Sequence, residues 1–346
     1  MSLLEIFISV AASIVLPATL TISGAFLCHK KWFDKEINSH LFRSTTDFML
    51  PLYNLFTLPR AYDREEIWEL WPLVVSPFIV MPILFIVGLL AGFIIKVPNN
   101  LRYSIASTYA FSSLGNMGIL MARSSCSTFG FFYGESQCDK AISYLCILWL
   151  SLYITMTLIS TTFYRKDSNY IGEPLSSTII RYLLQPFPIV ALIANIIGII
   201  PGTGWFLFDK DSVGYMLTDS AVIIGSCGIM FSQIIIGCEI PLNWKQEIVL
   251  DKWHLAWLAF SRHFLVSTLV LLYVTFLWHY DLFYGDKVMA YTIFIGLSMP
   301  PPFMILVVME YYGMVVKDVL VLILWMFILS PIAIIPASII LFSSIS

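Results

Sequence analysis

The sequence predicts an all-α polytopic membrane protein with ten transmembrane helices, arranged as a 5+5 inverted repeat with a crossover of broken helices 4 and 9. Of the 346 residues, 59% are hydrophobic and only 12% are charged, whereas a soluble domain carries about 25% charged residues. Ten apolar stretches approach or exceed the length that a helix needs to cross the hydrocarbon core. Two of these stretches are interrupted at mid-depth by glycine or proline clusters.

The ten predicted spans are joined by short connections, so no soluble domain is expected and the function must lie within the helix bundle. Most contain about 20 apolar residues, as a spanning helix requires. The second is the least apolar, and the fourth and ninth are interrupted. Their ranges are 5–27, 41–58, 69–95, 101–123, 139–163, 182–203, 213–237, 253–278, 287–309 and 317–343.

The orientation follows from the excess of Lys and Arg that cytosolic loops carry. With both termini on the non-cytosolic side, twelve of the 19 Lys and Arg residues fall in or beside cytosolic loops, and six lie on the opposite side. The remaining one, Arg262, lies inside a span. The net charge of −3 indicates neither a nucleic-acid nor an acidic-lipid partner.

An odd number of spans per repeat inverts the second repeat relative to the first, as in many secondary transporters. We divide the chain into a first repeat at 1–163, a short cytosolic linker at 164–181 and a second repeat at 182–346. Span four contains "FSSLGNMGILM" (111–121) and span nine contains "GLSMPPPFMIL" (296–306). Each repeat therefore has a breaker cluster followed by a similar apolar tail.

The paired breakers predict a site for a small organic anion. Proline lacks an N–H and cannot continue a helix undisturbed, and a carbonyl freed in hydrocarbon is costly unless protein or water satisfies it. Half-helix N-termini that meet at mid-membrane can hold an anion without a metal or cofactor. Ordinary kinks are the alternative, because proline is common in membrane helices. The predicted substrate-binding residues are Gly115, Asn116, Gly118, Pro300, Pro301, Pro302 and Tyr109.

Three charged residues inside spans are interpreted as gating or proton-carrying groups. Asp47 and Asp219 lie in spans two and seven, which correspond in the two repeats, and Arg262 lies in span eight. A charge at mid-membrane costs about 2.5–3.5 kcal/mol on insertion scales, so each requires a reason. The alternative for Arg262 is a structural pair with one of the aspartates, or a side chain that extends to the interface.

Cys126 and Cys138 share one loop, "CSTFGFFYGESQC", on the predicted non-cytosolic side. The endoplasmic-reticulum lumen and the cell exterior both permit disulfides, so a Cys126–Cys138 bridge is predicted, with two free thiols as the alternative. The sequence has no Walker loop, zinc-ligand spacing or plausible Ser-His-Asp arrangement. We therefore expect neither an enzyme nor a cofactor or metal.

Several of these motifs resemble the auxin efflux carrier family of PIN-FORMED and PIN-LIKES membrane transport proteins, most closely its PIN-LIKES branch. "SLGNMGIL" resembles the family's Gly-Asn-Leu-Gly-Asn-Leu-Pro, which maps to Gly115, Asn116 and Gly118. The Cys126–Cys138 loop, "TDSAVIIG" in span seven and "SMPPPFMILVV" in span nine also resemble family motifs. Arg262 falls where the family's eighth span carries an arginine.

The resemblance implies a scaffold subdomain and a transport subdomain that cross at spans four and nine. It also implies export or sequestration of auxin-like carboxylates or other amphipathic acids, often by a homodimer, and favours the endoplasmic-reticulum membrane over the plasma membrane. The chain departs from the family pattern in span four, which lacks the second asparagine and the proline, and in its very short 164–181 loop. No feature of the sequence specifies auxin.

The expected function is therefore secondary transport of small organic anions by alternating access. Two other classes stay open from the sequence. A receptor or scaffold that kept the fold and lost transport would bind a ligand without moving it, and a channel would pass currents far above carrier turnover.

Overall fold

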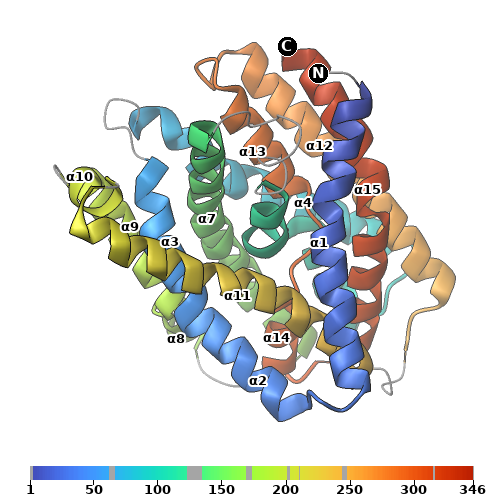
Figure 1. Cartoon of the computed structure of the whole chain (residues 1–346). Coiled ribbons are helices and arrows are strands. Elements are labelled where there is room, and N and C mark those ends of the chain that lie inside the picture. Colours follow the sequence, from blue (N-terminus) through green and yellow to red (C-terminus); the bar gives the residue numbers. More distant parts are fainter. Residues whose placement is uncertain are drawn as a thin grey trace. The chain divides into compact units, whose positions relative to one another are not determined.

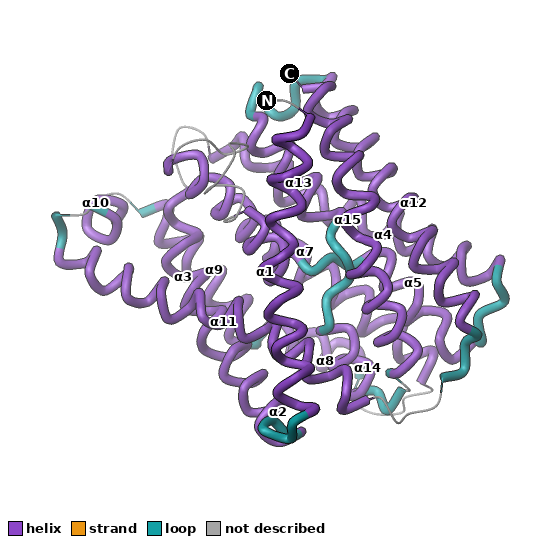
Figure 2. Tube along the Cα trace, turned by 45° about the vertical axis from the view of Figure 1, so that its right-hand side comes forward, coloured by secondary structure: helices purple, strands orange, loops and turns teal. Residues whose placement is uncertain are grey.

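The computed structural model describes residues 3–61, 67–122, 135–168, 174–200, 203–209, 211–243, 248–314 and 316–345. Within these ranges every regular element is helical and no residue lies in a strand (Figure 2). The predicted all-α class is therefore confirmed.

The chain forms two compact units, and each unit draws on both halves of the sequence. Unit 1 comprises Met1–Leu73, Gly115–Leu150 and Leu183–Leu242. Unit 2 comprises Val74–Leu114, Ser151–Tyr182 and Asn243–Ser346. The predicted five-helix repeats at 1–163 and 182–346, with their linker at 164–181, divide the chain by sequence correspondence and not by contacts. They stay a prediction.

Unit 1 contains long apolar helices together with shorter helices in which the pattern of backbone hydrogen bonds changes. Span two changes in this way: it runs as an α-helix, a π-helical segment and a second α-helix. Pro51 lies at the start of the second part, where its missing N–H disturbs the α-helical hydrogen-bond ladder. The elements are α1 (Leu3–His29), α2 (Lys35–Ser44), η1 (Thr45–Met49), α3 (Leu50–Thr57), η2 (Leu58–Ala61), η3 (Ile67–Leu70), most of η5 (Leu114–Gly118), the first part of α7 (Glu135–Ser168), α9 (Pro186–Ile199), α10 (Thr203–Phe208) and α11 (Val213–Asn243).

Glycines allow a close helix contact within unit 1. A Cβ on Gly24 of α1 would lie 2.0 Å from the Ile234 carbonyl oxygen, and one on Gly237 of α11 would lie 1.9 Å from the Thr21 carbonyl oxygen. The backbones of α1 and α11 are therefore in close contact at both glycines. Small residues allow membrane helices to pack closely in this way.

Unit 2 is centred on the packing of α12 against α15 and α13. Figure 1 shows α12 and α15 side by side. Two of its helices begin with an aspartate N-cap: Asp251 accepts from the Trp253 N–H, and Asp286 accepts from the N–H groups of Val288 and Met289. The elements are α4 (Trp71–Ile94), η4 (Asn99–Leu101), α5 (Arg102–Ala110), the second part of α7, α8 (Leu175–Leu183), α12 (Lys252–His279), α13 (Lys287–Ser298), α14 (Met304–Tyr311) and α15 (Lys317–Ile345).

Five helices among the described residues are long and apolar enough to cross a membrane. They coincide with predicted spans three, five, seven, eight and ten: Trp68–Ile94, Gln137–Lys166, Val213–Leu242, Lys252–His279 and Lys317–Ile345. The helices α8 and α9 pass the same test only together, as a bent pair. A multi-pass membrane protein is thus supported, while the ten-helix, five-plus-five arrangement stays a prediction.

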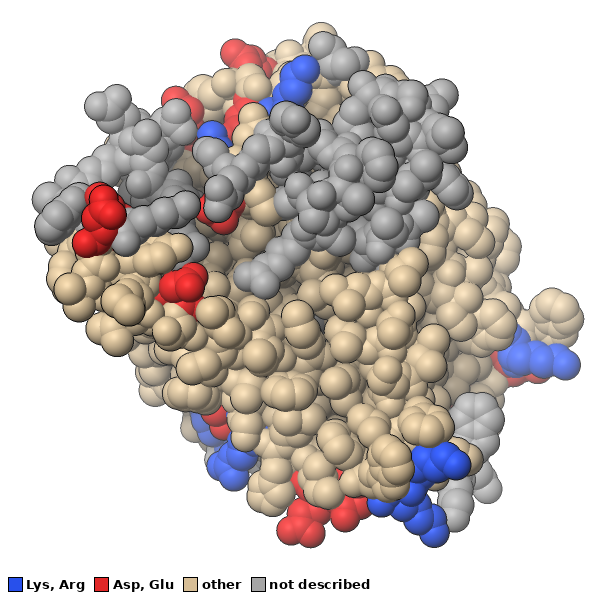
Figure 3. Space-filling model, viewed as in Figure 1, with Lys and Arg blue, Asp and Glu red and all other residues tan. Residues whose placement is uncertain are grey.

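The surface of α11 fits contact with lipid. Its exposed side chains include Val213, Met216, Leu217, Ile223 and Ile224. Figure 3 shows the side of α11 that is turned to the viewer covered almost entirely by uncharged side chains. Because large exposed apolar patches are rare on soluble monomers, this surface is consistent with membrane insertion.

Candidate functional site

Both predicted interruptions are present. In span four, α5 ends at Ala110 and Phe111 is extended (φ −89°, ψ 146°). In span nine, α13 ends at Ser298 and Met299 is extended (φ −56°, ψ 152°), after which the chain resumes as α14. Single prolines do not have this effect, because α4 continues through Pro77 and Pro82. The predicted interruptions of the helices at 101–123 and 287–309 are therefore present, while the crossover of two broken membrane spans stays a prediction.

The proline run frees carbonyls, and the chain at the break of span four donates hydrogen bonds to this region. Pro300 and Pro302 cannot donate to the carbonyls of Gly296 and Ser298, four residues earlier. The Ser112 hydroxyl donates to the Gly296 carbonyl oxygen at 2.5 Å, and the Ser113 N–H donates to the Pro300 carbonyl oxygen at 2.7 Å. The two breaks therefore lie against each other within unit 2.

Arg262 joins the C-terminal ends of the two half-helices. Its side chain is fully buried, and Nε donates to the Thr108 carbonyl oxygen of α5 at 3.3 Å. Nη1 donates to the Ser298 carbonyl oxygen of α13 at 3.2 Å, and Nη2 donates to the Met299 carbonyl oxygen. An arginine that extends to the interface is thus contradicted, because burial places the guanidinium inside the unit.

A neighbouring histidine fixes the position of that guanidinium. His263 Nδ1 lies 3.4 Å from Arg262 Nη1, and His263 Nε2 bonds to the Met326 carbonyl oxygen of α15. Since the arginine can only donate, Nδ1 accepts from it and the histidine proton sits on Nε2. The ring therefore ties Arg262 to α15.

Two hydroxyls at the breaks have no hydrogen-bond partner among the described residues. Ser113 Oγ and Ser298 Oγ are buried, with the residues 2% and 0% exposed, and neither makes a hydrogen bond within the described part of the chain. Buried hydroxyls are normally paired. We call Ser112, Ser113, Ser298, Met299, Pro300 and Arg262 the break site; two of its hydroxyls have no partner among the described residues.

Comparison with known proteins identifies the family of the chain. A family profile described as membrane transport protein matches residues 10–337, nearly the whole sequence. The chain belongs to this family. It is the family of the auxin efflux carriers and PIN-like membrane transport proteins, so the resemblance seen in the motifs is confirmed. A search of curated protein sequences finds no match.

The family consists of transporters rather than enzymes. In secondary transporters, broken helices commonly form the substrate site. Of the predicted substrate-binding residues, Tyr109 and Pro300–Pro302 belong to unit 2. Pro300 and Pro301 are buried and Pro302 is partly exposed. The Tyr109 hydroxyl donates to the Leu258 carbonyl oxygen at 3.0 Å and lies 2.6 Å from Ser261 Oγ, so this hydroxyl already bonds to α12.

The remaining predicted binding residues belong to unit 1, because the boundary between the units falls after Leu114. Gly115 packs directly on an indole: a Cβ there would lie 2.1 Å from Trp149 Cζ2. Gly118 is buried. The side chain of Asn116 lies outside the described residues, so its role stays a prediction.

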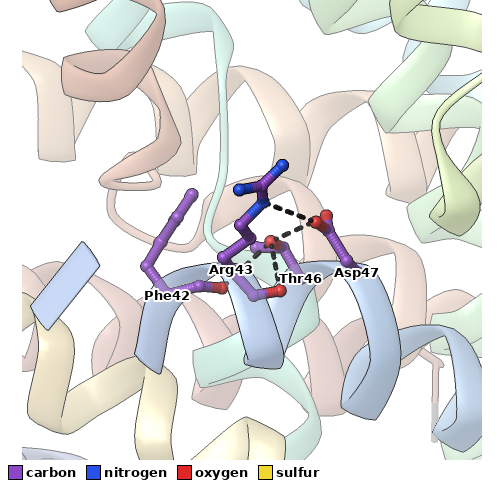
Figure 4. Close-up of polar contacts among 4 residues, drawn as sticks. All are labelled: Phe42, Arg43, Thr46 and Asp47. Carbon is purple, nitrogen blue, oxygen red and sulfur yellow. Dashed lines mark hydrogen bonds and ion pairs between the residues drawn. The ribbon is translucent and has the colours of Figure 1, made fainter. Parts of the chain in front are cut away.

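The two aspartates also belong to unit 1. Asp47 is exposed and its Oδ2 lies 3.6 Å from Arg43 Nε, one helical turn earlier, with Thr46 Oγ1 beside it (Figure 4). Asp219 is partly exposed. The partners of Arg262 within the described residues are carbonyls and His263 rather than a carboxylate. Gating or proton transfer by Asp47, Asp219 and Arg262 stays a prediction.

Only one of the two cysteines of the predicted disulfide lies among the described residues. Cys138 carries a disulfide bond, but Cys126 lies outside the described residues, so the Cys126–Cys138 pairing stays a prediction.

Sequence reasoning missed the serines of the break site. The pattern that could have identified them is a hydroxyl residue directly beside each breaker cluster, in "FSSLG" and in "GLSMP".

Proposed function

We propose that this family member is a secondary transporter of small amphipathic organic anions, working by alternating access. The observation that carries the proposal is the bonding of one helix break to the other within a transporter-family chain. Broken helices in such carriers form the substrate site near the middle of the bilayer.

The charges at the break site do not repel an anion. Each helix C-terminus carries roughly −0.5 charge, so the ends of α5 and α13 together contribute about −1. The guanidinium of Arg262, which keeps its charge in proteins, offsets this. A solute at the break site therefore meets no net negative charge from these groups, and it has two hydroxyl donors available, on Ser113 and Ser298.

The amphipathic character of the substrate follows from what surrounds those donors. Phe111 and Met299 are buried next to the serines in the chain, so apolar surface adjoins the polar groups. Such a mixture suits a carboxylate on an aromatic or aliphatic body. The proposed site in unit 2 includes Pro300–Pro302, with Tyr109 as a supporting contact. Gly115, Asn116 and Gly118 are proposed as substrate-binding residues of unit 1.

Three further features belong to the proposal. The distribution of Lys and Arg supports both termini on the non-cytosolic side, and the likeness to the PIN-LIKES branch supports the endoplasmic-reticulum membrane. A homodimer is proposed on the same likeness. Asp47 and Asp219 are proposed as the groups that exchange protons or gate the two states.

Uptake into proteoliposomes tests the function. Purified protein should accumulate radiolabelled indole-3-acetate or an aliphatic carboxylate against empty liposomes, with saturation. Ser113→Ala combined with Ser298→Ala should lower uptake about tenfold or more, because a lost hydrogen bond to a charged group costs about 1.5–3 kcal/mol. Ser330→Ala is the matched control, since Ser330 is equally buried but bonds its own helix at the Phe327 carbonyl oxygen.

Other results would favour the other classes of protein. Saturable binding without any movement into the liposomes would support a receptor or scaffold. Ion currents far above carrier turnover would support a channel. Either result would contradict the proposal.

A further inference from the structure

The helices of span two carry a series of buried polar side chains with unused hydrogen-bonding groups. The residues are Asn38 of α2, Thr45 of η1, and Asn54 and Thr57 of α3, and none is more than 6% exposed. Each has at least one side-chain atom without a hydrogen-bond partner in the described part of the chain. Buried polar groups are normally paired, so four such residues along one span require an explanation.

Asn54 has the largest unmet requirement of the four. Its side chain is fully buried, and neither Oδ1 nor Nδ2 has a hydrogen-bond partner among the described residues. A carboxamide offers an acceptor oxygen and two N–H donors, and burying it without partners strongly opposes folding. Asn54 therefore requires a small partner that can both donate and accept hydrogen bonds.

Thr57 lies one helical turn from Asn54 on the same face of α3. Its Oγ1 makes no hydrogen bond, whereas the hydroxyls of Thr155 and Thr161 donate to the carbonyl four residues earlier in their own helix. Cβ atoms three residues apart on a helix are separated by about 5–6 Å, a distance that one molecule of the size of water bridges. Asn54 and Thr57 can therefore share a single bound molecule.

Small residues lie on the helix that covers this part of α3. The helix α9 packs against α3 and η2 (Figure 1), and its buried residues include Ala191 and Ala194, both 0% exposed. Alanine side chains leave space that a water molecule can fill beside polar groups. From α7, Ser143 Oγ donates to the Thr57 carbonyl oxygen at 3.0 Å, so a second helix contributes a polar group next to Thr57.

We propose that unit 1 binds ordered water on the buried face of span two, with one water molecule bridging the Asn54 carboxamide and the Thr57 hydroxyl. Buried water makes about three hydrogen bonds to polar groups that the protein leaves unsatisfied. Asparagine and threonine carry no charge, which favours a neutral molecule over an ion. The break site belongs to unit 2, so this proposal does not depend on the proposed carrier function.

An apolar residue of similar volume distinguishes a hydrated site from a dry one. In a dry site, Asn54→Leu removes an unsatisfied carboxamide, and the Tm of the purified protein should rise. In a hydrated site, the same change removes a partner of the bound water and leaves Thr57 unsatisfied, so the Tm should fall by a few degrees. A Tm above that of the wild type would overturn the proposal.

A double-mutant cycle tests whether the two side chains share one molecule. The Tm loss of the combined Asn54→Leu and Thr57→Val variant should be clearly smaller than the sum of the two single losses, because both changes act on the same water. Thr161→Val is the control: the equally buried Thr161 hydroxyl bonds the Thr157 carbonyl of its own helix, so its loss should add to that of Asn54→Leu. Additive losses for Asn54→Leu and Thr57→Val would contradict the bridge.

Radiolytic labelling of the wild-type protein covers the case in which these variants do not fold. A short X-ray pulse generates hydroxyl radicals from bound water, and these modify the side chains beside it. Leu58 lies one turn after Asn54 on the same face and is 0% exposed, yet it should be labelled. Leu322 of α15 is also 0% exposed and should stay unlabelled. Equal labelling of Leu58 and Leu322, measured by mass spectrometry, would overturn the proposal.

Discussion

At the scale of single residues, the breaks depend on side chains that replace the donors missing from proline. Ser112 serves the carbonyl of Gly296, and Arg262 serves that of Ser298. In hydrocarbon an unsatisfied carbonyl costs several kcal/mol, so these two side chains are as much a part of the break as the prolines are.

Removing the Ser112 hydroxyl should destabilise unit 2. Ser112→Ala leaves the buried Gly296 carbonyl without its donor, at a cost of about 1–3 kcal/mol. The Tm of the purified protein measures this loss, and Ser112→Thr should recover most of it. Ser107→Ala is the control, because the equally buried Ser107 hydroxyl bonds the Tyr103 carbonyl of its own helix. Equal Tm values for the two alanine variants would contradict the role given to Ser112.

Asn116 should affect transport rather than folding. Asn116→Ala is expected to lower the uptake rate about tenfold, equivalent to about 1.4 kcal/mol, with Tm unchanged. Asn100→Ala, which alters an exposed asparagine at the entrance of the same span, should behave as the wild type. Wild-type uptake by Asn116→Ala would remove this residue from the proposed site.

At the scale of elements, close backbone contact and interrupted helices have opposite requirements. The crossing of α1 and α11 needs residues without a Cβ at Gly24 and Gly237. The breaks in spans four and nine need serine and arginine side chains that reach another element. Both requirements follow from the absence of water in the bilayer core, where packing and internal hydrogen bonds must hold helices together.

A methyl group at Gly237 should separate α1 from α11. Gly237→Ala would place Cβ 1.9 Å from the Thr21 carbonyl oxygen, and overpacking of this kind costs about 1–3 kcal/mol. The Tm should fall accordingly. Gly92→Ala in α4 is the matched control, since its nearest neighbour, Val97 Cγ2, would lie at 3.6 Å. A Tm for Gly237→Ala equal to that of Gly92→Ala would exclude a close crossing.

At the scale of the whole molecule, neither compact unit is a continuous segment of chain. Unit 1 and unit 2 each need residues from before position 151 and after position 182. Neither unit can be completed before the second half of the chain is made, and long-range contacts of this kind slow folding. We therefore expect truncation after the first half to leave both units incomplete.

The termini provide a test of orientation at this scale. A glycosylation acceptor fused to the C-terminus should be modified in cells, because the Lys and Arg distribution places that end on the non-cytosolic side. The mobility shift on deglycosylation measures this outcome. An acceptor placed in the predicted cytosolic loop between Arg165 and Arg181 should stay unmodified. The reverse pattern would overturn the orientation.

The helix break at the triple proline, one ion pair and five apolar spans could be predicted from local sequence. The triple proline at 300–302 predicted a break because missing N–H groups are a property of the residue itself. The pairing of Arg43 with Asp47 was also predictable, because residues four apart lie on one face of a helix. The five clear spans followed from apolar length alone.

The partners of the breaks depended on the tertiary structure. Arg262 is 154 residues from Thr108 along the chain, and Ser112 is 184 residues from Gly296. The sequence by itself determined that carbonyls would be freed and that a buried cation had to find acceptors. Only the tertiary structure decided that the Arg262 guanidinium donates to carbonyls at the two breaks, because packing selects hydrogen-bond partners from distant segments.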